Sequence, residues 1–305
     1  MINSNLAPIL LFAYNRTDHL KETVNALREN TLAGNSILYI ISDGPRINDI
    51  ESFNEIEKVR AYISTLTGFG EIRVIQNQIN LGLAKSIIDT VTSLIEKYKK
   101  VIVLEDDIIT SKYFLEFMNE GLDLYKNSTE VWHLSGWNYP LLRHKRDTGS
   151  FLWRGMNCWG WATWEDRWKH FNKQPERLVD SWSKSQIADF NIDNRKNFFS
   201  QVKLNYDGKL NTWAIFWYAT IFENNGLCLN PVVSMTKNIG LDGSGSNCKK
   251  QTNNDYFAID NKVTQFPSIF HEDKYFLKEI KKYLRMTEPS VVQRIKDKLY
   301  RMFSS

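Results

Sequence analysis

This chain has little cysteine and no long apolar run, and both shortages narrow what it can be. Its three cysteines, Cys158, Cys228 and Cys248, lie far apart and fit no metal-binding spacing, so we expect reduced, structural thiols. No segment approaches the roughly 20 apolar residues of a membrane span. The first residues lack the basic and apolar regions of a signal peptide. We therefore expect a cytoplasmic protein.

Two common nucleotide-binding motifs are also missing. Neither the dinucleotide-binding pattern G-x-G-x-x-G nor the P-loop pattern G-x-x-x-x-G-K-[ST] occurs in the chain. A Rossmann dehydrogenase and a P-loop enzyme are therefore disfavoured.

Positive charge is concentrated in the C-terminal tail. Residues 274–305 hold nine Lys or Arg and three acidic residues, a local charge of +6 in a chain whose total is +4. The slightly acidic remainder argues against nucleic acid as a partner, since a nucleic-acid-binding core carries basic residues over one face. Helices are expected at 274–285 and 289–303. The second has the basic amphipathic pattern of helices that bind anionic membranes, and the alternative is a helix packed on the domain with a solvated basic side.

Apolar segments of strand length alternate with amphipathic helical segments over the first third of the chain. With 42% hydrophobic residues, the chain can bury one large core. Strands are expected at 8–14, 36–42, 72–76 and 101–104, and helices from 17, near 51–66 and after 82. This alternation predicts an α/β fold with a parallel sheet covered by helices on both faces.

Three consecutive carboxylates, Glu105, Asp106 and Asp107, follow the fourth predicted strand. In open α/β sheets, ligands bind beyond the carboxyl ends of the strands. Clustered carboxylates there can hold Mg2+ or Mn2+. The alternative interpretation is a solvated acidic turn.

Polar residues also follow the other three predicted strands, namely Arg16, Asp43, and Gly82 with Lys85. Because parallel strands end at the same edge, we expect these residues to converge on the acidic triplet. Asp43 can accept hydrogen bonds from a base or ribose, and Arg16 and Lys85 can meet base or phosphate. Together with a metal, these groups suit a nucleotide diphosphate.

Residues 8 to about 250 resemble GT-A-fold glycosyltransferases of the bacterial family-2-like type that is similar to N-acetylglucosaminyltransferase I. The segments that carry this resemblance are Tyr14-Asn15-Arg16, Ser42-Asp43-Gly44, Asn80-Leu81-Gly82, Glu105-Asp106-Asp107, Ser135-Gly136-Trp137-Asn138, Trp159-Gly160-Trp161 and Pro231 to Gly240.

The resemblance implies a GT-A, Rossmann-like nucleotide-sugar-binding fold with a mixed, mainly parallel sheet flanked by helices. It implies a catalytic domain at 1–255, in which 1–135 binds the nucleotide sugar and 136–255 binds the acceptor. A basic helical tail occupies 256–305.

The resemblance also implies roles for individual residues. Glu105-Asp106-Asp107 takes the place of the Asp-x-Asp motif, so Asp107 is expected to bind Mn2+ or Mg2+, with Glu105 and Asp106 facing ribose or donor sugar. Arg16 and Asp43 are expected to face the base.

The activity implied is inverting transfer of a hexosyl or N-acetylhexosaminyl group from a nucleotide diphosphate sugar to a glycan or lipid-linked acceptor. Such a reaction would serve cell-surface polysaccharide biosynthesis, as of lipopolysaccharide or capsule. The enzyme would work peripherally on the cytoplasmic face of the inner membrane.

The catalytic base is the weakest part of the match. The related animal enzyme carries its base at a position that corresponds to residues 211–215 here, which hold no carboxylate. The remaining candidates, in order of preference, are Asp166, Glu165 and Asp242. A surface salt-bridge role is the alternative for the first two.

Asp166 and Glu165 belong to a Trp-rich segment, 153–168, whose indoles suit the apolar face of a sugar ring. We expect at least half of its five tryptophans to pack in the core instead. Asp242 belongs to a Gly-rich segment, 237–250, that is expected to close over the diphosphate or to serve as a surface linker.

Two rival functions stay open. A nucleotidyltransferase would also bring a metal and a nucleotide to a parallel sheet, but it normally has a Gly- and Lys/Arg-rich loop after the first strand. A catalytically degenerate, carbohydrate-binding GT-A protein would keep the fold without turnover.

Overall fold

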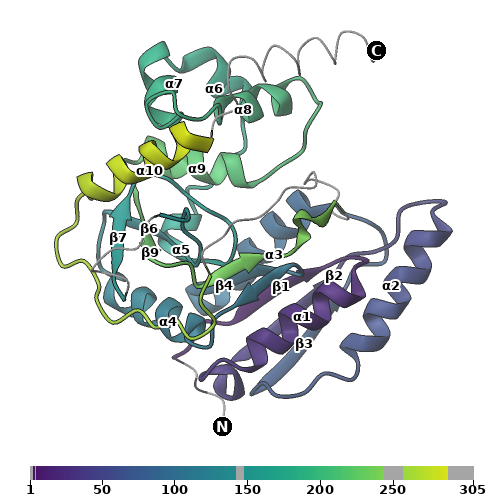
Figure 1. Ribbon diagram of the computed structural model, residues 1–305. Helices are drawn as coiled ribbons and strands as arrows, with labels where there is room; N and C mark the ends of the chain where they lie inside the picture. The colour runs from purple at the N-terminus through teal and green to yellow at the C-terminus, as the bar shows by residue number, and fades with distance from the viewer. Residues whose placement is uncertain (1–2, 4, 142–147, 244–256, 288–305) are drawn as a thin grey trace.

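The computed structural model describes residues 3, 5–141, 148–243 and 257–287, and its centre is an eight-stranded sheet (Figure 1). The strand order is β3-β2-β1-β4-β8-β6-β9-β7. The strands are β1 (Ile9–Ala13), β2 (Ile37–Ser42), β3 (Glu71–Gln76), β4 (Lys100–Glu105), β6 (Val131–Ser135), β7 (Ser150–Trp153), β8 (Trp161–Trp164) and β9 (Leu227–Pro231). The pairs β3-β2, β2-β1, β1-β4 and β6-β9 are parallel, whereas β8 and β7 run antiparallel to their neighbours. The predicted mixed, mainly parallel sheet is confirmed.

Helices cover both faces of this sheet. The helices of the described residues are α1 (Thr17–Arg28), α2 (Ile50–Ile63), α3 (Leu83–Tyr98), α4 (Phe114–Leu124), α5 (Glu165–Trp168), α6 (Pro175–Ser181), α7 (Lys184–Phe190), α8 (Phe199–Tyr206), α9 (Ala214–Glu223) and α10 (Lys274–Thr287), with short 3-10 helices η1 (Ala33–Asn35) and η2 (Gly240–Asp242). Successive strand residues point to opposite faces. In β4, Ile102 and Leu104 therefore join the core under α1, α2 and α4, while Val101 and Val103 join the core under α3 and α9.

The later part of the chain enters the same sheet through β8. This strand lies between β4 and β6, and its register pairs Trp164 with Lys100 and Trp161 with Val103. The end of β8 that carries α5 thus lies at the amino end of β4. A second, two-stranded sheet joins β5 (Ile108–Thr110) to β10 (Thr236–Asn238) and holds residues 236–238 beside the chain that leaves the acidic triplet.

The Trp-rich segment packs mainly in the core, as predicted. Trp153, Trp161, Trp164 and Trp168 are buried, and Trp159 is partly exposed. Trp161 stacks on Trp213 of the segment before α9, with ring centroids 5.0 Å apart. These indoles therefore stabilise the junction between β8 and α9.

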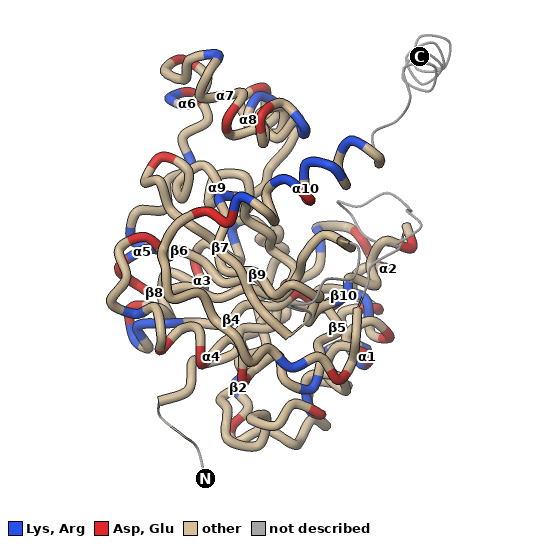
Figure 2. The backbone as a smooth tube through the Cα atoms, turned by 60° about the vertical axis from the view of Figure 1, so that its left-hand side comes forward, with Lys and Arg blue, Asp and Glu red and all other residues tan. Residues whose placement is uncertain are grey.

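The first predicted tail helix forms and packs on the domain. α10 buries Phe276, Ile280 and Leu284 against the core beside β7, and the positions of its Lys and Arg residues are blue along the backbone tube in Figure 2. The second predicted tail helix, 289–303, lies outside the described residues. None of the helices in the described ranges is both long and apolar enough to cross a membrane.

Candidate active site

A cavity of about 320 Å3 opens at the carboxyl edge of the parallel strands. Its walls come from the ends of β1, β2 and β4 and from the loop that opens α3. Of the residues predicted to form the site, the cavity brings together Arg16, Asp43, Gly82, Glu105, Asp106 and Asp107. Four segments far apart in the sequence therefore meet at one edge.

Arg16 lies directly against the acidic triplet. Its Nη2 donates to Asp106 Oδ1 and, over 2.8 Å, to Asp107 Oδ2. The backbone of Asp106 is held by the hydroxyl of Thr23 on α1, which donates to its carbonyl oxygen over 2.8 Å. The side chains involved are largely buried, with 17% of Arg16, 5% of Asp106 and 10% of Asp107 exposed. One guanidinium thus bridges two neighbouring carboxylates.

Burial and mutual repulsion raise the proton affinity of this cluster. Burial first, and then the nearby charges of Asp107 and Asp106, raise the pKa of Glu105 to about 8. Burial raises the pKa of Asp106 to about 6, although Arg16 opposes the shift. Burial lowers the pKa of Arg16, but the charges of Asp106 and Asp107 outweigh it and the net pKa is raised. The single positive charge of Arg16 does not balance the carboxylates of this cluster, which would favour a further cation.

Asp107 is the residue best placed to hold a metal. Its Oδ1 is buried and accepts no hydrogen bond from any described residue. A buried carboxylate oxygen without a partner is costly, and a divalent cation would satisfy it. Among the described residues, neither this cluster nor any other place brings three His, Cys, Asp or Glu side chains close enough together to share one metal ion. The site therefore fits an ion such as Mg2+, which is commonly bound by one or two carboxylates together with substrate phosphates.

Asp43 has its hydrogen-bonding capacity largely taken up by the protein. Its Oδ1 accepts from the backbone N–H groups of Gly44 and Leu81 and from Asn77 Nδ2, and its Oδ2 accepts from Gly82 N–H, each over 3.0 Å. Asp43 therefore fixes the loop that opens α3. This structural role explains why a carboxylate stands here whether or not it also contacts a base.

The position of Gly82 is set by backbone geometry. It caps the start of α3 with a φ of 76°, a conformation that other residues rarely adopt. Lys85, one turn further on, forms an exposed ion pair with Asp89 over 2.7 Å. Lys85 is not among the described residues that line the cavity.

Glu165 and Asp166 lie at the opposite edge of the sheet. The N–H of Glu165 donates to the carbonyl of Lys99, which precedes β4, so the acidic triplet lies the length of β4 away, about 20 Å at the usual rise of ~3.3 Å per residue. Glu165 pairs with Lys99 Nζ over 3.1 Å. Glu165 therefore forms a surface salt bridge, which is the alternative role considered for it from the sequence.

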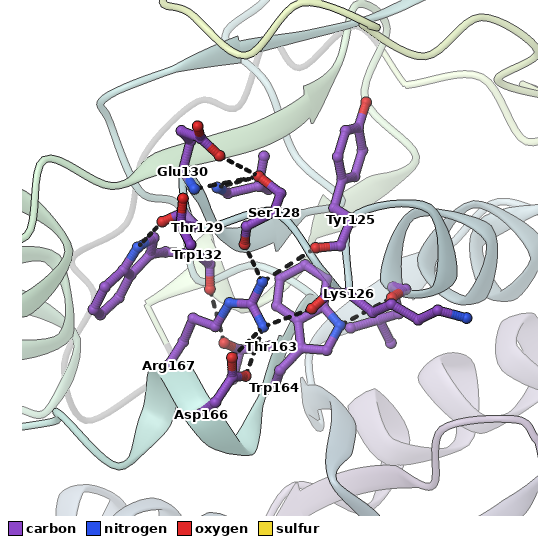
Figure 3. A network of polar contacts seen from close by, with 12 residues as sticks. Tyr125, Lys126, Ser128, Thr129, Glu130, Trp132, Thr163, Trp164, Asp166 and Arg167 are labelled. Carbon is purple, nitrogen blue, oxygen red and sulfur yellow. Dashed lines mark hydrogen bonds and ion pairs between the residues drawn. The ribbon is translucent and has the colours of Figure 1, made fainter.

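Asp166 belongs to a structural network centred on Arg167 (Figure 3). The guanidinium of Arg167 is buried, and both Asp166 oxygens accept from its Nη1 over 2.6 Å. The same group donates to the carbonyl oxygens of Tyr125, Lys126 and Ser128. Asp166 thus balances the charge of a residue that closes the C-terminal end of α4.

Asp242, the third candidate base, lies on the cavity side of the molecule. It ends η2, whose first residue, Gly240, lines the cavity. Its Oδ2 lies 3.2 Å from His19 Nε2 on α1, and about half of its side chain is exposed (49%). Of the three candidates, Asp242 alone belongs to a segment that reaches the acidic triplet. The Gly-rich segment beyond Gly243 lies outside the described residues until 257.

Three further residues line the cavity without having been assigned a role from the sequence. Arg46 follows the same strand as Asp43 and lies over the ring of Tyr14, 5.9 Å from its centroid. Asn211 comes from the segment before α9, and its Oδ1 accepts a hydrogen bond from Lys173 Nζ. Gly240 approaches so closely that a Cβ there would overlap Asp107 Oδ2. Only the place of Arg46 after a strand could have signalled its position.

Comparisons with known proteins give structural likeness at low identity. No protein family model and no curated protein matches the chain. A mannosyltransferase from Pyrobaculum calidifontis, in complex with GDP-Man and Mn2+, aligns over 73% of this chain and 72% of its own, with 8% identity and a TM-score of 0.39. S. aureus TarS 1-349 aligns over 76% of this chain and 60% of its own, with 11% identity and a TM-score of 0.42. A cytidylyltransferase from Leptospira borgpetersenii aligns over 55% and 63%, with 14% identity and a TM-score of 0.31. These values are too low to transfer an activity to this chain.

Proposed function

We propose that this protein is a metal-dependent, inverting glycosyltransferase that moves a hexosyl or N-acetylhexosaminyl group from a nucleotide diphosphate sugar to a glycan or lipid-linked acceptor. The observation that carries the proposal is the buried Oδ1 of Asp107, which has no hydrogen-bond partner among the described residues, in the wall of a cavity that Arg16 and Arg46 also line. A carboxylate that needs a cation and two guanidinium groups suit a diphosphate. The cavity volume of about 320 Å3 lies at the lower end of the usual range for small-molecule sites.

Asp107 would hold Mn2+ or Mg2+ in this proposal, and the ion would neutralise the diphosphate as it leaves. The base and ribose would lie between the ends of β1 and β2, near Tyr14 and Asp43. The acceptor would approach from the half of the chain that carries Trp159, a partly exposed indole in the segment that leads into β8.

Asp242 is the base of this proposal. Its carboxylate takes the proton of the acceptor hydroxyl as that oxygen attacks the anomeric carbon. The bond from this carbon to the diphosphate oxygen breaks, and its electron pair stays on the departing diphosphate. A change of Asp242→Asn is expected to lower turnover by about 100-fold or more with little change in donor affinity. Turnover within about threefold of wild type would remove Asp242 from this role.

Donor hydrolysis, assayed with and without Mn2+, tests the activity. A thermal-shift screen of nucleotide sugars chooses the donor first, because a ligand that binds the folded state raises the melting temperature. Metal-dependent hydrolysis of one donor supports the proposal. Absence of both hydrolysis and metal-dependent nucleotide binding would refute it.

A second candidate function is a GT-A-like protein that binds nucleotide sugar or carbohydrate without turnover. The observation that favours it is Asn211, an amide on the cavity wall that belongs to the segment 211–215, where the resemblance places the base of the animal enzyme and this chain has no carboxylate. Metal-dependent binding of a nucleoside diphosphate without any hydrolysis or transfer would support this candidate.

An anionic membrane surface is the proposed partner of α10. Lys274, Lys278, Lys282 and Arg285 are exposed on this helix, while its apolar face is already buried in the domain. The double change Lys278→Glu and Lys282→Glu should weaken binding to vesicles that contain anionic lipid. Lys21→Glu with Lys58→Glu, which alters net charge equally at α1 and α2, is the control, and equal losses in both variants would overturn the assignment.

A further inference from the structure

Arg16 takes the place of a counter-ion in the acidic cluster. Its guanidinium contacts Asp106 and Asp107 together, and a bridge of this kind uses donors that would otherwise be available to a ligand. The chain holds this arrangement from both sides, because Arg16 opens α1 and Asp107 accepts a hydrogen bond at its carbonyl from Ile239 N–H over 2.9 Å. The pair is therefore built into the fold.

Space around the pair is restricted. Gly240 lies against it, and a Cβ there would overlap Asp107 Oδ2 and would come within 2.7 Å of Arg16 Nη1. Asp107 Oδ1 remains buried and unsatisfied among the described residues, so one monovalent guanidinium does not complete the cluster. The site is only partly neutralised, because one guanidinium faces two carboxylates and Asp107 Oδ1 accepts no hydrogen bond from a described residue.

We propose that Arg16 is an exchangeable counter-ion, which gives up the carboxylates when a divalent cation binds and then pairs with the diphosphate of the nucleotide. This inference rests on the proposed function. A guanidinium matches two phosphate oxygens as well as it matches two carboxylate oxygens, so the exchange keeps its hydrogen bonds. Binding of the cation and binding of the nucleotide are thus coupled through one side chain.

The coupling has a measurable consequence. In the wild-type protein the cation competes with Arg16, so Mn2+ alone binds weakly, and a nucleoside diphosphate that accepts the guanidinium strengthens Mn2+ binding. Removing the guanidinium removes the competitor. Arg16→Gln is therefore expected to bind Mn2+ alone about tenfold more tightly than wild type and to lose about tenfold of the enhancement by nucleoside diphosphate, within the usual range of coupling between two sites.

The test measures Mn2+ binding to the full chain by calorimetry and by the electron paramagnetic resonance signal of unbound Mn2+, with and without UDP or GDP. Arg46→Gln is the matched control, since Arg46 lines the same cavity and lies over Tyr14 instead of the triplet. It should change nucleotide affinity and leave the affinity for Mn2+ alone unchanged.

The outcomes separate the exchange from the proposed function. The exchange is supported if Arg16→Gln binds Mn2+ alone more tightly than wild type does, while the affinity of Arg46→Gln for Mn2+ alone changes by no more than a small factor. Affinity equal to or weaker than that of wild type overturns it, even where wild type binds nucleotide in a metal-dependent way. Should Arg16→Gln fail to fold, Arg16→Lys carries the same test, because an ammonium bridges two carboxylates less well and should give a smaller gain of the same sign. Failure of the wild type to bind any nucleoside diphosphate with Mn2+ would instead remove the proposed function.

Discussion

Two arginines at opposite edges of the sheet form ion pairs of different kinds, Arg167 with one carboxylate and Arg16 with two. Arg167 has an aspartate and three backbone carbonyls as partners, and the aspartate is more than half exposed (57%). Arg16 faces two buried carboxylates, and one of them has an oxygen that no other described residue contacts by a hydrogen bond. The same residue types therefore form a hydrogen-bonded structural network in one place and, in the other, a cluster whose buried Asp107 Oδ1 has no partner in the described part of the chain. What distinguishes them is the balance of donors and acceptors after burial.

The largest expected effect comes from the incomplete cluster. Asp107→Asn keeps the shape of the side chain and removes its charge, so Mn2+-dependent binding of nucleoside diphosphate should weaken by at least about 100-fold. Loss of a hydrogen-bond partner behind a metal ligand alone typically costs about 10- to 100-fold. Calorimetry with and without Mn2+ measures the change. Unchanged affinity would show that the triplet is not the metal site.

The structural network should respond in stability instead. Arg167→Met leaves three backbone carbonyls near α4 without their donor, and the free energy of unfolding should fall by about 3 kcal/mol. Urea denaturation measures this loss. Nucleotide affinity of the folded variant should match wild type, and a selective loss of affinity would place Arg167 in the functional site.

A pH effect on stability is expected from His133, which is buried in β6. Its Nε2–H donates to Asn157 O over 2.9 Å and its Nδ1 accepts from Trp217 Nε1 over 3.2 Å. Burial lowers its pKa from 6.5 to about 3, so its contribution is fully present above pH 6.5 and is lost as pH falls. Between pH 7 and 5 the wild type should lose about 2 kcal/mol more than His133→Gln, at about 1.4 kcal/mol per unit.

That comparison uses a variant because other groups titrate in the same range. The raised pKa values of Glu105 and Asp106 favour the folded state as pH falls, and they cancel when the two proteins are compared. Parallel pH curves for wild type and His133→Gln would contradict the assignment of a neutral, buried histidine.

The smallest effect should follow changes at the exposed acids of the opposite edge. Glu165→Gln removes an exposed ion pair, and such pairs contribute about 0–1 kcal/mol. Asp166→Asn removes the charge of the more exposed partner of Arg167 and keeps an amide oxygen that can accept from Arg167 Nη1. Turnover should stay within about twofold of wild type. A large loss of turnover with stability intact would restore these residues as candidates for the base. It would also show that the edge of the sheet that carries Arg167 is a functional region in addition to the edge that carries Arg16.

The first half of the site could be predicted from the sequence because it depends on strand ends alone. Arg16, Asp43 and Glu105 each follow an apolar run, and parallel strands place such residues at one edge. There is also a simple reason why the sequence did not show that Glu165 and Asp166 lie at the opposite edge of the sheet from the acidic triplet. They follow β8, which runs antiparallel to β4, and no local pattern in four residues gives the direction of a strand.

The parts of the fold that could not be predicted are short or depend on distant contacts. Strands β5, β7, β8 and β10 have three or four residues each, too few to show a periodicity of two. Helices α6 to α8 are held by an aromatic cluster around Trp182 and Phe190, which joins segments separated in sequence. The close packing around Asp107 Oδ2 also depends on Gly240, more than a hundred residues away in the sequence.

The continuity of the sheet limits how this protein can move. β4 from the predicted donor half and β8 from the predicted acceptor half share a ladder of four paired residues, and β6 continues it. A hinge between the halves would have to break these hydrogen bonds in the middle of the core, so the two halves should unfold in one cooperative transition. Substrate-driven closure is then left to segments outside the ladder. One such segment is η2, which follows β10 and touches Asp107 through Gly240.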